Sequence, residues 1–155
     1  MRFIEYMDVG GATGFDSALM ISRHEMLETL TRDFGKIEAL SGQGAAPASR
    51  VALPDGWTFG IVSSTTRPFC ASCDRSRLTA DGVWYRCLYA HSGTDLRTPL
   101  RGAASGEELR QILVSAWRVR RDQGAVDRLT LSTRTAVPVA LLRRDPYLEM
   151  HTRGG

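Results

Sequence analysis

A group of three cysteines constrains the fold of this 155-residue chain more than any other feature of its sequence. Cys70 and Cys73 form a Cys-x-x-Cys pair, and Cys87 follows further along the chain. An odd number of cysteines does not indicate a disulfide framework, whereas clustered thiols indicate metal binding or redox chemistry. If the three thiols share one centre, the fold must return Cys87 to the side of the pair.

A predicted β-hairpin explains how the third cysteine can return. Asp81-Gly82 is a strong turn signal, and short strand-like segments flank it on both sides. With these two residues at the centre of a two-residue turn, Ala80 faces Val83 and Ser76 faces Cys87. The sequence therefore predicts that Cys87 lies within a few residues of the Cys-x-x-Cys pair.

The spacing of the cysteines leaves the kind of centre open. His91 follows Cys87 by four positions, so Cys70, Cys73, Cys87 and His91 could complete a closed tetrahedral zinc site. The same three thiolates could hold a 4Fe–4S cluster with one iron open to another ligand. A third interpretation is that the thiols are incidental, since unbridged cysteines are commonly buried. Spacing alone supports zinc and iron–sulfur equally.

Two arginines beside the cysteines favour the open cluster. Arg75 and Arg77 follow Cys73 directly, and residues two apart in an extended segment point to the same side. Two guanidinium groups presented in one direction suit phosphate oxygens. A solvated salt-bridge surface is the commoner role of such a pair, but beside a metal centre a phosphorylated substrate explains both features.

The rest of the sequence predicts a mixed α and β fold. Ser22 with Glu25, and Ser105 with Glu108, form capping boxes that predict the start of two amphipathic helices. Strand-like segments and turn signals occur between and around these helices. The expected elements are a strand over 2–8, a helix over 23–34, a loop over 41–49, a strand over 57–63, a helix after 105 and a strand over 137–142.

Composition indicates a globular chain that does not cross a membrane. It is 43% hydrophobic and 24% charged, and no apolar run approaches the roughly 20 residues that a membrane span needs. The N-terminus lacks the pattern of a signal peptide, which gives the cytoplasm as the expected location. Arginines accumulate after residue 97, but without interleaved aromatic residues or a known motif they do not favour nucleic-acid binding.

The residues around the cysteines resemble the molybdenum-cofactor GTP 3',8-cyclases, a family of radical S-adenosylmethionine lyases. The likeness is strongest over Cys70–Arg77 and continues at Asp81-Gly82 and Cys87-Leu88. It extends over most of the chain, including residues 2–8, 55–56, 60–64, 95–97, 100–102 and 154–155.

The resemblance implies a fold and a reaction. In this family an incomplete TIM barrel carries a first 4Fe–4S cluster that cleaves S-adenosylmethionine, and a C-terminal α+β domain carries a second. Residues 1–40 would be the end of the barrel and residues 50–155 the C-terminal domain. The family converts GTP to (8S)-3',8-cyclo-7,8-dihydroguanosine 5'-triphosphate in molybdopterin biosynthesis.

The resemblance also assigns roles to individual residues. Cys70, Cys73 and Cys87 would hold the second cluster, whose open iron is ligated by the guanine base of GTP. The GTP-binding tripeptide would be Arg75-Ser76-Arg77. Met7 would line the S-adenosylmethionine site, and the Gly154-Gly155 pair would reach into the active site.

The chain departs from the family pattern in its N-terminal part. No cysteine remains for the Cys-x3-Cys-x2-Cys motif of the first cluster, and residues 2–8 correspond to a late barrel strand. The expected partners are therefore GTP, a missing N-terminal barrel or a chain that supplies it, and a second copy in the homodimer of the family. The chain alone is not expected to be active.

Overall fold

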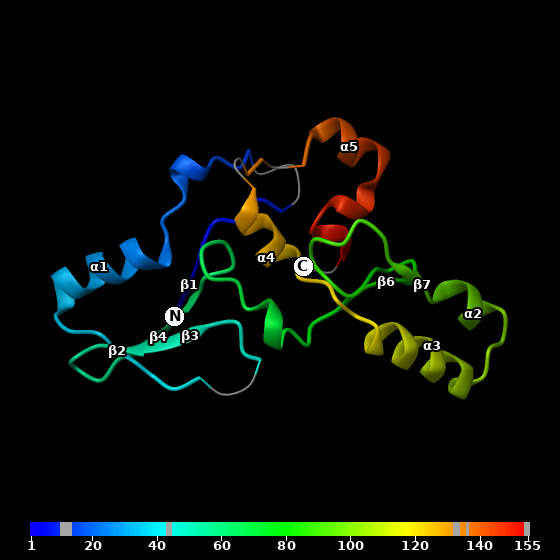
Figure 1. Ribbon diagram of the computed structural model, residues 1–155, viewed down its shortest axis with the longest axis horizontal. Coiled ribbons are helices and arrows are strands. Elements are labelled where there is room, and N and C mark those ends of the chain that lie inside the picture. Colours follow the sequence, from blue (N-terminus) through cyan, green and yellow to red (C-terminus); the bar gives the residue numbers. More distant parts are fainter. Residues whose placement is uncertain (10–13, 43–44, 132–133, 136, 154–155) are drawn as a thin grey trace. The chain divides into compact units, whose positions relative to one another are not determined.

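The computed structural model describes the chain except for residues 10–13, 43–44, 132–133, 136 and 154–155 (Figure 1). The described chain is a mixed α and β protein, as the sequence predicts, and it divides into two compact units. The first unit contains Met1–Asp8, Gly14–Asp74 and Ala125–Thr135. The second contains the described residues of Val9–Thr13, Arg75–Gly124 and Ala136–Gly155.

The first unit contains a four-stranded sheet with the strand order β1-β4-β3-β2. β1 and β4 run parallel, whereas β3 is antiparallel to both of its neighbours. A turn at Pro54-Asp55-Gly56 connects β3 to β4, and Gly56 there has a φ of 89°, which favours glycine. The strands are β1 (Arg2–Ile4), β2 (Glu38–Ala39), β3 (Ser49–Ala52) and β4 (Thr58–Val62).

Helix α1 (Arg23–Phe34) packs against this sheet through its apolar side. The predicted capping box is confirmed, because the Ser22 hydroxyl accepts from the Glu25 N–H while the Glu25 carboxylate accepts from the Ser22 N–H. The core consists of three buried sheet residues with helix residues packed around them: Val51, Phe59 and Ile61 with Met26, Leu27 and Leu30. Phe34, the last residue of the helix, is 56% exposed.

The strands of the first unit are shorter or more numerous than predicted. The strand expected over 2–8 ends at Ile4, although the Glu5 N–H still donates to the Val62 carbonyl. The loop expected over 41–49 gives way to β3 at Ser49, and β2 was not predicted. Both strands are short and carry polar residues, so neither produces a clear apolar alternation.

The second unit contains the antiparallel sheet β5-β6-β7. The hairpin predicted around Asp81-Gly82 is confirmed, but its predicted register is wrong by one residue. Leu78, not Thr79, lies opposite Trp84, which lengthens the connection by one residue. Gly82 has a φ of 90° in this connection, typical of a three-residue turn that ends in a left-handed glycine. The strands are β5 (Arg77–Leu78), β6 (Val83–Tyr85) and β7 (Thr94–Asp95).

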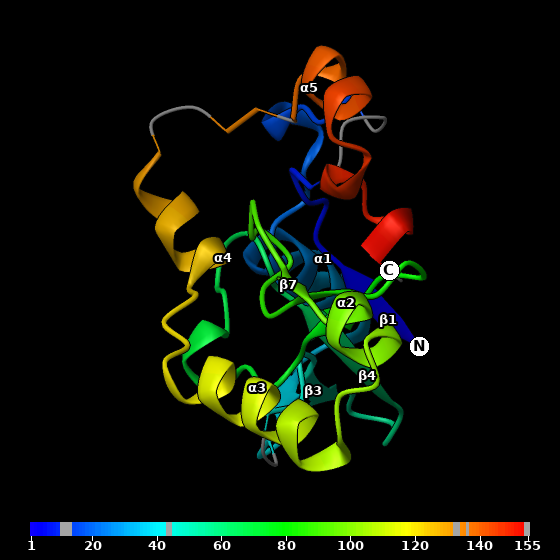
Figure 2. The ribbon, with the colours of Figure 1, turned by 90° about the vertical axis from the view of Figure 1, so that its right-hand side faces the viewer.

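Helices α2 (Arg97–Arg101) and α3 (Gly106–Arg118) follow β7 and lie beside this sheet (Figure 2). The indole rings of Trp84 on β6 and Trp117 on α3 are stacked with centroids 6.0 Å apart. The guanidinium carbon of Arg120 lies 4.6 Å from the centroid of the Trp117 ring on α3. Stacked and cation–π contacts of this kind add to simple apolar burial.

The prediction of a strand over 137–142 is wrong, because helix α5 (Val139–Arg144) occupies most of this segment. A short apolar run fits a strand or a helix equally well, and Pro138, the N-cap residue, has no N–H to donate to a strand ladder. The helices are α1, α2 (Arg97–Arg101), α3 (Gly106–Arg118), α4 (Gly124–Asp127) and α5 (Val139–Arg144). The 3-10 turns are η1 (Ser17–Leu19), η2 (Cys70–Ser72), η3 (Arg128–Thr130), η4 (Pro146–Leu148) and η5 (His151–Arg153).

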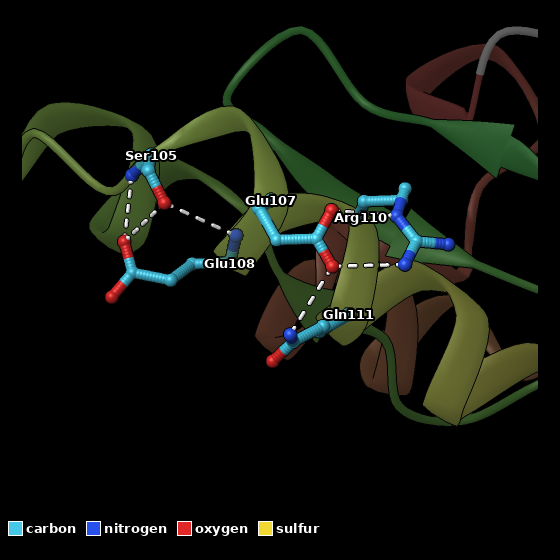
Figure 3. Close-up of polar contacts among 5 residues, drawn as sticks. All are labelled: Ser105, Glu107, Glu108, Arg110 and Gln111. Carbon is cyan, nitrogen blue, oxygen red and sulfur yellow. Dashed lines mark hydrogen bonds and ion pairs between the residues drawn. The ribbon is translucent and has the colours of Figure 1, made fainter.

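The first turn of α3 is held by the second predicted capping box (Figure 3). The Ser105 hydroxyl accepts from the Glu108 N–H, and the Glu108 carboxylate accepts from the Ser105 N–H at 2.7 Å. The bond from the Ser105 N–H lowers the pKa of the Glu108 carboxyl most, and a bond that the Ser105 hydroxyl donates to the same carboxylate lowers it further. One turn along, Arg110 makes a two-pronged contact with Glu107.

We expect Ser105→Ala to lower the free energy of unfolding by about 1 kcal/mol, because it removes the side-chain cap of α3. Urea unfolding at pH 7 measures this loss. The exposed Ser115 within the same helix is the control, since Ser115→Ala removes no cap. Since the folded pKa of Glu108 lies below its unfolded value, the carboxylate's contribution is lost as pH falls through the folded pKa, and the effect should shrink there.

Candidate metal and nucleotide site

Cys70 and Cys73 lie at the two ends of one tight turn in the first unit. Cys70 begins η2, and the Cys73 N–H donates to the Cys70 carbonyl at 3.1 Å. Both residues are half-buried and reduced. A turn of this kind places two soft ligands close together, which suits zinc or an iron–sulfur cluster.

Cys87 lies in the second unit, shortly after the end of β6. It is also half-buried and reduced, so the chemistry of the three donors fits a thiolate-bound metal. Within the described ranges, no three His, Cys, Asp or Glu residues form a group that could hold a metal ion. The convergence of Cys70, Cys73 and Cys87 stays a prediction.

Gly124, the first residue of α4, closely approaches Cys87. A Cβ at this position would lie 3.2 Å from the Cys87 Sγ and 2.5 Å from the Tyr89 Cβ. The second distance is shorter than a real contact between carbon atoms can be. A residue larger than glycine would therefore have to displace the segment that carries Cys87.

His91, the fourth ligand of the zinc alternative, is exposed between β6 and β7. It belongs to the same unit as Cys87. No contact in the described structure distinguishes a ligand from a solvated side chain at this position, so the Cys3His site stays a prediction.

Arg75, Ser76 and Arg77 lead into β5, and only Arg77 belongs to the strand. Their burial alternates, because the two arginines are half-buried while Ser76 and Leu78 are exposed. Alternation of this kind is what an extended segment produces. It agrees with the expectation that both guanidinium groups leave the chain on one side.

Met7 lies among buried polar residues that the sequence analysis missed. It is half-buried, and Glu5 and Asp8 around it are each 1% exposed. Arg128 donates from Nε to the Asp8 carboxylate at 2.7 Å. No local signal marks this group, because acidic residues that follow a strand are most often exposed.

A second set of buried polar residues follows β4, namely Ser63, Ser64 and Thr65. Because β1 and β4 are parallel, the segments after both strands leave the same edge of the sheet. This edge is where ligands bind in open parallel sheets. The expected role of Met7 in binding S-adenosylmethionine concerns this edge and stays a prediction.

Gly154-Gly155 lies outside the described residues, but the segment before it is anchored within the second unit. The Tyr147 hydroxyl of η4 donates to the Asp81 carboxylate at the hairpin turn, and the Thr79 hydroxyl donates to the same carboxylate at 2.6 Å. The Thr79 bond, followed by the Tyr147 bond, lowers the pKa of Asp81. The pKa of Tyr147 is raised, chiefly by the same hydrogen bond.

Comparison with known proteins gives the family. A family model described as "Molybdenum Cofactor Synthesis C" matches residues 1–126. The chain therefore belongs to the Molybdenum Cofactor Synthesis C family. This finding confirms the resemblance that the sequence around the cysteines indicated.

Relatives of this family are named as cyclases. The chain is 56% identical over its whole length to "GTP 3',8-cyclase 3" of Mycobacterium bovis, of which it covers 41%. It is 54% identical over its whole length to "GTP 3',8-cyclase 1" of Mycobacterium tuberculosis, covering 44% of that protein. A "GTP 3',8-cyclase" of Corynebacterium glutamicum is 37% identical over 82% of this chain and 36% of its own length.

The chain thus spans about two fifths of the length of these relatives. In the part of the chain that the structure describes, no helix has the length and apolar character that a membrane span requires.

We expect Gly124→Ala to destabilise the second unit by about 1–3 kcal/mol, because the added methyl group overpacks the contact with Tyr89 and Cys87. Urea unfolding, with alkylation of Cys87 followed by mass spectrometry, measures the loss and its site. The matched control is Gly106→Ala, since Gly106 is also the first residue of a helix but has open space around its Cβ position. Equal stabilities of the two variants would show that Gly124 tolerates a side chain.

Proposed function

We propose that this chain is the part of a GTP 3',8-cyclase that binds GTP and the second iron–sulfur cluster. The observation that carries the proposal is the 54–56% identity over the whole chain to two proteins named as GTP 3',8-cyclases. The three cysteines and the two arginines beside Cys73 support it, because they supply ligands for a cluster and for phosphates.

In this proposal Cys70, Cys73 and Cys87 are the thiolate ligands of a 4Fe–4S cluster. Three protein ligands leave one iron open, and the cluster when bound would supply a coordination position for the guanine base. The tight turn that holds Cys70 and Cys73 favours this role, since it fixes two ligands before the metal binds.

Arg75, Ser76 and Arg77 then contact GTP. A guanidinium group stays charged at all working pH values and offers several N–H donors in one plane, which suits the triphosphate. The Ser76 hydroxyl is exposed between them and can donate a further hydrogen bond. These residues orient the substrate, and orientation is their contribution to the rate.

The relatives are longer than this chain, and their additional segment would carry out the remaining steps of the reaction. We propose that β1 is the last strand of their incomplete TIM barrel, which carries the first cluster and S-adenosylmethionine, with Met7 lining that site. The resemblance of residues 2–8, which contain β1, to a late barrel strand of the family supports this placement. Gly154-Gly155 would reach the same active site.

The product of the whole enzyme would be (8S)-3',8-cyclo-7,8-dihydroguanosine 5'-triphosphate. This chain requires the N-terminal barrel, or a chain that supplies it, because its three cysteines are all assigned to the second cluster. A homodimer, as in the family, is the proposed assembly.

We expect anaerobic reconstitution of the chain to give about four irons and about four sulfides per chain. Metal and sulfide analysis measures this. Cys87→Ser should lower the iron content, whereas His91→Ala should leave it unchanged, because the open iron takes no histidine. One zinc without sulfide, lost in both variants, would instead establish the Cys3His zinc module.

We expect the double variant Arg75→Ala/Arg77→Ala to weaken GTP binding by at least about tenfold, because charge-assisted bonds to phosphate contribute about 1.5–3 kcal/mol each. Calorimetric titration of the reconstituted chain measures the affinity. Arg118→Ala, which removes an exposed arginine at the end of α3, is the control.

Titration with guanosine tests the assignment to phosphate. Guanosine lacks the phosphates, so its affinity should be the same for the double variant and the unmodified chain. An equal loss for guanosine and GTP would assign the two arginines to the base or to the stability of the fold.

A further inference from the structure

Glu5 is a buried carboxylate that joins three separate segments of the first unit. It is 1% exposed and follows β1 directly. Its Oε2 accepts from the backbone N–H groups of Thr65 and Thr66 at 2.9 and 2.8 Å. Its Oε1 accepts from the N–H of Arg23 at 2.8 Å and from the Thr66 hydroxyl.

Three of these four hydrogen bonds come from the turn that follows β4 and fix it, while the fourth comes from the start of α1. The turn is closed by the Arg67 N–H, which donates to the Ser63 carbonyl at 3.1 Å. The Thr65 hydroxyl donates to the Tyr6 carbonyl at 3.0 Å, so a second bond joins the turn to the segment after β1. Without Glu5 the Thr65 and Thr66 N–H groups would lose their carboxylate partner. Thr65 is 3% exposed, and a buried donor without a partner destabilises its surroundings.

The turn lies immediately before the cysteine pair. Arg67, Pro68 and Phe69 alone separate Thr66 from Cys70. Pro68 has a fixed φ, which limits how this connection can bend. The Cys73 N–H then donates to the Cys70 carbonyl, so the position of the first cysteine also fixes the second.

We propose that Glu5 is a positioning residue for the Cys70–Cys73 half of the metal centre. It acts through the turn at Thr65-Thr66, which it holds against the end of β1 and the start of α1. The proposal rests on the proposed function in one respect, namely that Cys70 and Cys73 bind a metal. In this proposal Glu5, which is buried and distant in sequence from the cysteines, sets the positions of two metal ligands.

The hydrogen-bond pattern predicts how different substitutions act. In Glu5→Gln the amide oxygen can take the place of Oε2 and keep both bonds from Thr65 and Thr66. The NH2 group then faces the Arg23 N–H and the Thr66 hydroxyl, which can rotate to accept. Glu5→Gln therefore loses chiefly the bond to α1, whereas Glu5→Ala loses all four.

The experiment compares the full chain with three variants, namely Glu5→Ala, Glu5→Gln and the control Val51→Ala. Val51 is 2% exposed in the sheet core of the same unit, so its truncation destabilises the unit without touching the carboxylate. Hydrogen exchange of the metal-free chain measures the exchange rates of the Thr65 and Thr66 amides. Iron per chain after reconstitution and the electron paramagnetic resonance spectrum of the reduced centre measure ligand placement.

In Glu5→Ala we expect the two amides to exchange at least about tenfold faster relative to the core strands. Iron per chain should fall to below about half, and the spectrum of the remaining centre should change. Glu5→Gln should have the iron content and the spectrum of the unmodified chain. Val51→Ala should also resemble the unmodified chain in both quantities.

A Glu5→Ala chain with full iron and an unchanged spectrum would overturn the positioning role. So would a Val51→Ala chain that loses as much iron, because general instability would then explain the loss. Failure of the unmodified chain to bind metal would instead overturn the proposed function, while the exchange rates would still report whether Glu5 orders the turn.

Discussion

The parallel pairing of β1 with β4 determines how the first unit is built. It joins Arg2–Ile4 to Gly60–Val62, two segments separated by the whole of α1, β2 and β3. Parallel strands place their following segments at the same edge of the sheet, so the residues after Ile4 and those after Val62 meet there. This edge carries Glu5 and Asp8 from one strand and Ser63–Thr65 from the other, all buried.

Burial of two carboxylates at this edge requires specific partners. An ionised carboxylate without partners is strongly disfavoured in the interior of a protein. Glu5 receives its donors mainly from the backbone, and Asp8 receives the guanidinium of Arg128. The Asp8–Arg128 pair joins the strand end to residues that follow α4, so loss of Arg128 would deprive the buried Asp8 carboxylate of its guanidinium partner.

Signals between residues close in the sequence predict the local structure of this chain correctly. The wrong predictions concern features that depend on contacts between residues further apart. The two capping boxes at Ser22 and Ser105 are confirmed, because a cap depends on residues three apart. The register of the hairpin was wrong, since Asp81-Gly82 fits a two-residue or a three-residue turn and the pairing of Leu78 with Trp84 decides. The helix over Val139–Arg144 was missed because its apolar run carries no period.

The residues of the candidate site also fall into those that local spacing reveals and those that it does not. Cys70, Cys73, Arg75 and Arg77 can be recognised from spacing alone, because two-residue and three-residue intervals set their relative placement. Glu5 could not be recognised, since an acidic residue after a strand is most often exposed and its partners lie at Arg23 and Thr65-Thr66. Family resemblance supplied the rest of the site, including Met7, for which no local signal exists.

The two groups of cysteines are each positioned by a contact within their own unit. In the first unit the hydrogen bonds of Glu5 hold the turn before Cys70, and in the second the missing side chain of Gly124 leaves room for Cys87. A metal site binds more tightly when its ligands are already fixed, because less conformational freedom is lost on binding. Neither Glu5 nor Gly124 could ligate the metal in the proposed centre. Their role is to set where the ligands lie, so substitutions there should alter metal binding while all three thiols remain in the chain.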